Sequence, residues 1–344
     1  MKIDTGLHSD ISKAADAARR AEDAGYDGLF GAEIAHDPFL PLALAAQATS
    51  RIELGTGIAV AFARNPMTLA VIGHDLQRLS QGRFVLGVGS QIKPHVTKRF
   101  SMPWSSPAAR MREFIMAMRA IWNTWDTGER LAFRGEFYKH TLMTPMFDPG
   151  KNLYGPPPVL LAAVGPAMTS VAAEVADGLV AHAFTTSSYF RDVTVPAVER
   201  GLASSGRARS DFQISMPLFV VTGRDEEQLR AHAKPARAQL AFYGSTPAYR
   251  PVLEHHGWGE LGDELNTLSK RGEWEQMGDA ITDDVLDAFA IIGEPDAIAP
   301  AIKARFGGLL DRIQFFAADI DDHATWAPVL DAIRAINDPS GAES

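Results

Sequence analysis

The stretch that decides the fold is RIELGTGIAVAFARNPMTLAVIGHDLQRLSQGRFVLGVGS, residues Arg51–Ser90. Its first part, Ile52–Val60, is apolar and rich in β-branched residues, which is typical of a buried strand. Pro66–Leu79 follows with proline in its first turn, where the missing N–H costs little, and this favours a helix. Arg83–Val88 is a second short apolar run. Strand, helix and strand in this order predict a βαβ unit with parallel strands.

The same alternation continues on both sides of this stretch. The other predicted strands are Lys2–Leu7, Asp27–Ala32, Val159–Ala163, Gly178–His182, Gln213–Val221, Phe289–Ile292 and Arg312–Phe316. The other predicted helices are Asp10–Ala24, Pro38–Thr49, Pro107–Trp122, Ala167–Ala176, Ser188–Ser204, Asp225–Ala241, Pro295–Phe306 and His323–Ile336. About eight β/α units in series predict an α/β fold, a closed (β/α)8 TIM barrel. An open, doubly wound sheet is the alternative that the pattern leaves.

Two segments break the alternation and predict insertions at the carboxyl ends of the strands, Gln91–Ser106 and Gly244–Asp287. Between the two, Leu131–Leu142 has the alternation of a hairpin, and Thr144–Pro158 is a loop rich in proline and glycine. No linker is long enough to separate domains. We therefore predict one barrel domain over residues 1–338, followed by a polar tail over residues 339–344.

The composition excludes several classes of function. The 344 residues carry 33 Lys and Arg against 42 Asp and Glu, a net charge of −9 without a basic stripe, so we expect neither nucleic-acid nor membrane partners. The absence of cysteine excludes disulfides, thiolate metal sites and cysteine nucleophiles. The histidines lack metal-binding spacing, so no metal is expected. No apolar run approaches about 18 residues and no signal peptide is evident, so we expect a cytoplasmic protein.

In a barrel, function resides at the carboxyl ends of the strands, and a few residues there could carry chemistry. Glu33 and His36 follow the second strand and could contact a cofactor ring or form a solvated pair. The GVGSQ run, residues 87–91, could let a flat ring approach the backbone or could be a plain turn. Gly165 precedes a helix whose free N–H groups favour an anion, although an ordinary β–α turn has the same pattern. His182 could face a pocket or cap a helix.

Three motifs together resemble the luciferase-like monooxygenase family. They are the opening stretch, Arg51–Ser90; the segment PVLLAAVGPAMTSVAAEVADGLVAH, Pro158–His182; and YDGLFGAE at the second strand. The likeness covers roughly the first 180 residues well and the rest by general layout. Within the family, GVGSQIKPHVTKRFSMPWSSPAARM is similar to the branch of oxidoreductases that uses the deazaflavin coenzyme F420.

The resemblance implies a (β/α)8 barrel and assigns the cofactor-binding residues. A bulge with a non-proline cis peptide at Gly57–Ile58 is implied behind the central ring, and Glu33 is implied near that ring. The phosphate of the cofactor tail is implied against the turn after the fifth strand, and His182 falls where some relatives contact it. The remaining implied cofactor contacts are Ser90, Gln91, His95, Ala163, Val164, Gly165 and Pro166.

Two positions depart from the branch members that oxidise sugar phosphates. Those members have a histidine after the acid of strand two and a glutamate after the glycines of strand four, whereas this chain has Ile34 and Ile92. The departures argue against a sugar phosphate and favour a more apolar substrate. We expect these isoleucines to line the pocket with Glu33, His36, Gln91, His95 and His182.

The predicted function is hydride transfer between F420 and a small, apolar organic molecule, with the reaction direction left open. His36 or His95 is the candidate that moves a proton, because histidine titrates near neutral pH, and Glu33 is the competing candidate. The alternatives are an FMN-dependent monooxygenase, which uses reduced flavin and oxygen, and a non-catalytic cofactor-binding barrel. We expect a homodimer or a higher homo-oligomer.

Overall fold

The computed structural model describes residues 1–7, 10–318, 320 and 323–337. Its strands alternate with helices along the chain, and the predicted fold class, a (β/α)8 barrel of parallel strands, is confirmed. Within this fold the chain divides into two compact units. The first unit holds residues 2–180 and 197–213, and the second holds residue 1, residues 181–196 and the chain from 214 onward.

The sheet of the first unit places β1, β2, β3, β5 and β8 side by side in that order. All six residues of β5 are buried, as expected for a parallel strand that is covered on both faces. The bounds of the strands in this part of the chain are β1 Lys2–Leu7, β2 Gly28–Gly31, β3 Glu53–Thr56, β4 Ala59–Val60, β5 Phe84–Gly89, β8 Val159–Ala163 and β9 Gly178–Ala181.

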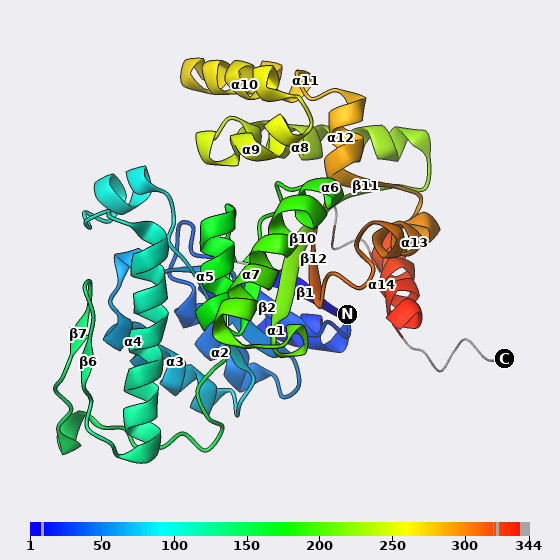
Figure 1. Cartoon of the computed structure of the whole chain (residues 1–344). Helices are drawn as coiled ribbons and strands as arrows, with labels where there is room; N and C mark the ends of the chain where they lie inside the picture. Colours follow the sequence, from blue (N-terminus) through cyan, green and yellow to red (C-terminus); the bar gives the residue numbers. More distant parts are fainter. Residues whose placement is uncertain (8–9, 319, 321–322, 338–344) are drawn as a thin grey trace. The chain divides into compact units, whose positions relative to one another are not determined.

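Helices return the chain between these strands. Their bounds are α1 Ala14–Asp23, α2 Phe39–Ala48, α3 Pro66–Leu79, α4 Pro107–Thr127, α5 Pro166–Val175 and α7 Val195–Ser205. Helix α3 has the predicted bounds, because Asn65 caps its N-terminus by accepting a hydrogen bond from the Thr68 N–H at 3.0 Å. The long helix α4 has the predicted hairpin beside it, formed by β6 Phe133–Arg134 and β7 Lys139–His140 (Figure 1).

The second unit is organised around β10, Gln213–Thr222, nearly all of which belongs to it. One half of β10 pairs in parallel with β12, Arg312–Phe316, and the other half pairs with β11, Ala290–Gly293. The helices of this unit are α6 Ser187–Tyr189, α8 Glu226–Gly244, α9 Arg250–His255, α10 Gly259–Arg271, α11 Trp274–Asp279, α12 Asp283–Phe289, α13 Pro295–Phe306 and α14 His323–Asn337.

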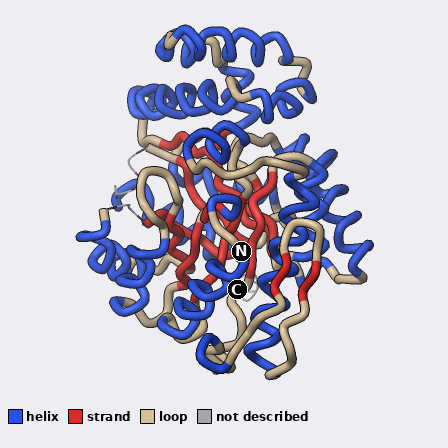
Figure 2. The backbone as a smooth tube through the Cα atoms, turned by 90° about the vertical axis from the view of Figure 1, so that its left-hand side faces the viewer, coloured by secondary structure: helices blue, strands red, loops and turns tan. Residues whose placement is uncertain are grey.

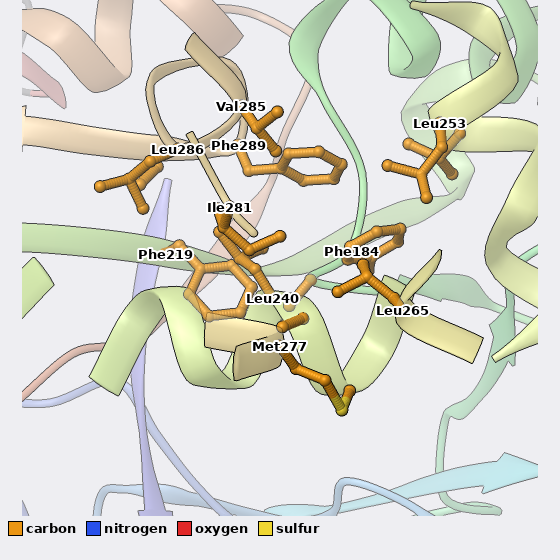
Figure 3. Packing of buried hydrophobic residues seen from close by; sticks show 14 of the residues in the cluster. Phe184, Phe219, Leu240, Leu253, Leu265, Met277, Ile281, Val285, Leu286 and Phe289 are labelled. Carbon is orange, nitrogen blue, oxygen red and sulfur yellow. The ribbon is translucent and has the colours of Figure 1, made fainter. Parts of the chain in front are cut away.

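The predicted insertion Gly244–Asp287 is helical rather than irregular. Helices α10 and α11 pack on α8 and α9 in two layers, which stand at the top of Figure 2. Their apolar side chains, together with Phe184 and Phe219, form the buried cluster shown in Figure 3. The sequence pattern missed all four helices from α9 to α12. Helices α9, α11 and α12 have only 6 or 7 residues, too few for a repeating apolar stripe, whereas α10 has 13 residues and is long enough for one.

The single-domain organisation over residues 1–338 stays a prediction, and the predicted tail over residues 339–344 lies outside the described residues. In the part of the chain that is described, no helix combines the length and the apolar character needed to cross a membrane.

Candidate functional site

The strand ends singled out in the sequence lie at one edge of the first unit. Strands β2, β3, β5 and β8 are consecutive neighbours, and their pairings are parallel. Their carboxyl ends therefore face the same way. Glu33 follows β2, Gln91 follows β5 and Gly165 follows β8. The fold thus brings together residues that are up to 132 positions apart in the chain.

A bulge interrupts this edge between β3 and β4. The peptide bond between Gly57 and Ile58 is cis, as the family resemblance implied. The N–H of Gly57 donates to the Gly31 carbonyl at 2.8 Å, and the Ile58 carbonyl accepts from the Glu33 N–H at 3.2 Å. On the other side, the Thr56 hydroxyl donates to the Gly87 carbonyl at 2.6 Å. The bulge is therefore tied to both neighbouring strands.

The glycines of β5 make room for this bulge. A Cβ atom on Gly87 would lie 1.9 Å from the carbonyl oxygen of Thr56, and one on Gly89 would lie 2.9 Å from Cδ1 of Ile58. A side chain at Gly87 would therefore push the backbone of the bulge away, whereas one at Gly89 would require the Ile58 side chain to shift. The sequence suggested that these glycines admit a flat ring or form a plain turn. In the structure they allow a close approach of two strands.

Glu33 holds the bulge from the side of β2. Its carboxylate oxygen Oε2 accepts from the Val60 N–H at 2.7 Å and from Nη1 of Arg64 at 2.6 Å. Arg64 also donates to Asp37 at 3.2 Å, and the side chain of Glu33 is only 8% exposed. A buried carboxylate that is paired in this way is costly to disturb. The geometry therefore favours a bracing role for Glu33 over that of a proton donor.

The two candidate histidines of this edge differ from Glu33 in that both are exposed. His36 lies on the loop after β2, and His95 begins a π-helical turn, His95–Arg99, in the predicted insertion after β5. The two loops are in contact, because the guanidinium of Arg99 donates to the Ile34 carbonyl. The Ile34 side chain is 72% exposed, whereas Ile92 is half-buried. Both histidines are thus open to exchange protons with solvent.

Ser90 and Gln91 shape the turn after β5. The Ser90 hydroxyl donates to the carbonyl of Gln91 at 3.0 Å, and the Gln91 side-chain oxygen accepts from the Ile92 N–H at 2.9 Å. Gln91 itself has a φ of +61°, which is uncommon for a residue with a side chain. These contacts are local and fix the direction in which the loop leaves the strand.

The turn after β8 leaves open space at the start of a helix. Gly165 caps α5 with its backbone alone, and its carbonyl accepts from the N–H and the hydroxyl of Thr169, each at 3.1 Å. A Cβ atom on Gly165 would meet no heavy atom within 4 Å. Ala163 is buried and Val164 half-buried, whereas Pro166 is exposed. The first N–H groups of a helix favour an anion, and nothing here crowds them.

His182 lies in the second unit, directly after β9, and both of its ring nitrogens have partners. Nδ1 accepts from the Phe184 N–H at 3.0 Å, and Nε2 lies 3.1 Å from the hydroxyl oxygen of Tyr249. Tyr249 also stacks on the imidazole at 4.4 Å, and Tyr243 meets it edge-on at 4.7 Å. This burial lowers the pKa of His182 to about 4, so the ring is neutral at physiological pH.

Sequence reasoning missed two residues that the structure brings into these sites. Arg64 lies 31 positions after Glu33, and Tyr249 lies 67 positions after His182. Neither is part of a local motif, so only the pairing of distant segments reveals them. Among the described residues, no group of three histidine, aspartate or glutamate side chains is placed to hold a metal ion.

Comparisons with known proteins agree with this geometry. The model of the luciferase-like monooxygenase family matches residues 2–312. An uncharacterized protein of Mycobacterium tuberculosis strain H37Rv is 55% identical over 313 residues, which cover 91% of this chain and 92% of that protein. The 5,10-methylenetetrahydromethanopterin reductase of Archaeoglobus fulgidus is 30% identical over 294 residues, 82% of each chain. The structure of the coenzyme F420-dependent tetrahydromethanopterin reductase from Methanopyrus kandleri has the same fold, with 22% identity, a TM-score of 0.79 and 98% of each chain covered.

The contact between Gly87 and the bulge predicts a loss of stability in Gly87→Ala. The added methyl group would meet the Thr56 carbonyl, so the free energy of unfolding should fall by about 3 kcal/mol, near the upper end for an overpacked core. Gly31→Ala is the matched control, because a Cβ there has its nearest neighbour at an ordinary 3.5 Å. Urea unfolding of both variants measures the difference. Equal midpoints for the two would contradict the explanation.

The desolvated, partly buried His182 predicts a pH-dependent part of the stability. Between about pH 6.5 and 4 the unfolded chain binds a proton at this residue that the folded chain does not, so stability falls as the pH is lowered through this window. One pKa unit corresponds to about 1.4 kcal/mol, so the wild type should lose about 3 kcal/mol more than His182→Gln between pH 7 and pH 4. Urea midpoints of both proteins across this range test the prediction. Parallel pH curves would show that His182 keeps an ordinary pKa.

Proposed function

This chain belongs to the luciferase-like monooxygenase family, and we propose that it transfers hydride between coenzyme F420 and a small, apolar organic substrate. The members that it resembles include reductases, one of which is F420-dependent. The proposal is also supported by the motif similar to the F420 branch, Gly87–Met111, which begins within β5.

The observation that carries the proposal is the edge formed by β2, β3, β5 and β8. It combines a glycine-lined bulge with an uncrowded helix N-terminus two strands away. A flavin-like cofactor needs both features, because its flat ring must lie against the backbone and its phosphate needs N–H donors. In this assignment Gly57 and Ile58 back the ring, and the N–H groups that follow Gly165 and Pro166 bind the phosphate. The residues present therefore fit a phosphorylated flavin or deazaflavin.

The bound deazaflavin supplies hydride, while the protein supplies position and proton transfer. Glu33 holds the bulge and, as a carboxylate close to the proposed ring site, tunes its electrostatics. His36 or His95 exchanges a proton with the substrate, since both stand on loops at this edge and are open to solvent. Exposed Ile34 and half-buried Ile92 give the same loops an apolar character, which suits an apolar substrate.

A side-by-side titration with oxidised F420 and with FMN tests the cofactor. We expect F420 to bind at least about tenfold more tightly, which corresponds to about 1.4 kcal/mol. Tighter binding of FMN, together with oxygen consumption by the reduced complex, would favour the flavin monooxygenase. Tight binding without turnover across a broad panel of apolar aldehydes, ketones and activated alkenes would favour a non-catalytic barrel.

Gly165→Asp should weaken binding of the preferred cofactor by at least about tenfold, because the new carboxylate repels the phosphate and occupies its space. Gly165→Ala is the matched control, since its methyl group meets no atom within 4 Å, and it should bind within about threefold of the wild type. Fluorescence or absorbance titrations give both constants. An unchanged constant for Gly165→Asp would move the phosphate site elsewhere.

His36→Ala and His95→Ala should separate the proton-transfer role from binding. The variant that removes the true acid or base should slow a single turnover by about 10²–10⁴, while F420 affinity stays near that of the wild type. The measurement uses reduced F420 and whichever substrate of the panel oxidises it. Near-wild-type rates in both variants would exclude the two histidines, and Glu33, Gln91 or a bound water would remain as candidates.

A further inference from the structure

The most exposed large apolar side chains of the described chain gather on one loop of the first unit, residues 142–154, which continues from the β6–β7 hairpin (Figure 1). Leu153 is 91% exposed, Met146 88%, Leu142 77% and Phe147 72%. A single exposed apolar residue is ordinary on a protein surface, whereas a group of this size marks a place where another molecule binds.

The loop is held by its polar residues, and its apolar side chains are left outside. Asn152 is buried; its Nδ2 donates to the His74 carbonyl at 3.0 Å, and its Oδ1 accepts from the Tyr154 N–H at 3.1 Å. The ammonium group of Lys151 pairs with the carboxylate of Asp126 at 2.7 Å. An asparagine is thus inside and the leucine next to it outside, which is the reverse of the usual arrangement.

Two turns fix the first part of the loop. The N–H of Phe147 donates to the Thr144 carbonyl at 2.9 Å, and the N–H of Gly150 donates to the Asp148 carboxylate at 2.8 Å. The backbone therefore has a defined path, and a partner that binds here has little backbone to order. Preformed surfaces of this kind bind at a low entropic cost.

The charge and composition of the loop indicate a second copy of this chain as the partner. Its charged residues are Asp148 and Lys151, one of each sign, so the loop is neutral in a chain of net charge −9. Two copies can therefore meet at this loop without bringing like charges together. An apolar surface that contains methionine and phenylalanine is also typical of homodimers, whose interfaces are more apolar than those of transient complexes.

The size of the surface fits a dimer as well. At roughly 150–200 Å² for a fully exposed side chain of this size, the four exposed side chains present roughly 500–650 Å². Each partner of a standard interface buries about 800 Å². The loop therefore supplies most of the area that one copy needs, and a twofold axis would place the same surface on the second copy opposite it.

We propose that residues 142–154 form a dimer interface, in which the loop of one copy packs against the same loop of a second copy around a twofold axis. The homo-oligomer expected from the sequence thereby has a defined contact surface. The loop leads into the amino end of β8, whereas the proposed cofactor edge lies at the carboxyl ends of the strands. The inference is therefore independent of the proposed function.

Sedimentation velocity across the micromolar range tests the dimer. The wild type should be dimeric, and Met146→Glu and Leu153→Glu should each raise the dissociation constant at least about 100-fold, because the interface would bury unpaired carboxylates. Phe242→Glu is the control, since Phe242 is 51% exposed on α8 in the other unit, and this variant should remain a dimer. Urea unfolding of each variant shows that it is folded.

The absence of cysteine from the chain allows an independent measurement. Leu153→Cys introduces a single thiol, whose reaction with a maleimide requires access to solvent. With the reagent in excess, its rate constant should fall as the protein concentration is raised through the dissociation constant of the dimer. The rate constant of Phe242→Cys should not depend on protein concentration.

Two results would overturn the proposal: a wild type that stays monomeric across this range, or a dimer that both Met146→Glu and Leu153→Glu retain. Flotation with vesicles of phosphatidylcholine and phosphatidylglycerol tests a lipid surface as the partner. Binding of monomeric wild type to these vesicles, lost in Leu153→Glu, would assign the loop to lipid instead. None of these measurements uses F420 or FMN, so a failure of the proposed function and a failure of the dimer are distinguishable.

Discussion

The close approach of β3 and β5 at the Gly57–Ile58 bulge is the constraint on which the first unit depends. The strands can approach because residues 55 and 87 lack side chains; a Cβ on either would lie 3.0 Å or less from a backbone oxygen of the neighbouring strand. The bulge in turn presents the Ile58 carbonyl and the Val60 N–H to Glu33. The glycines, the Gly57–Ile58 bulge and the Glu33–Arg64 ion pair therefore contact one another and form one structural unit.

The two units differ in the charge of the side chains at the residues discussed above. In the first unit, the charges of Glu33 and Arg64 lie against each other with little exposure, and Asp37 also contacts Arg64. The uncrowded N–H groups of α5 are then the local feature that attracts an anion. In the second unit, aromatic burial keeps His182 neutral and Tyr249 protonated.

Much of the fold was predictable from local patterns. Helix α3 has the predicted bounds because proline at its first turn and the capping Asn65 act within a few residues. Strand β5 was recognisable because a strand that is buried on both faces must be apolar throughout. The helices α9 to α12 were not predicted, and their apolar residues pack in a cluster with segments as distant as Phe184 and Phe219.

The sequence by itself determined the alternation of strands and helices, the family, and the residues that follow each strand end, because these depend on local periodicity and on contiguous motifs. The tertiary structure alone decided what those residues do. In the folded chain, β3 approaches β5 closely at Gly87. The carboxylate of Glu33 pairs with Arg64, and the imidazole of His182 hydrogen-bonds to Tyr249. Each of these roles requires two segments at least 31 residues apart to meet at one distance and orientation. Only the register and packing of the folded chain set that geometry.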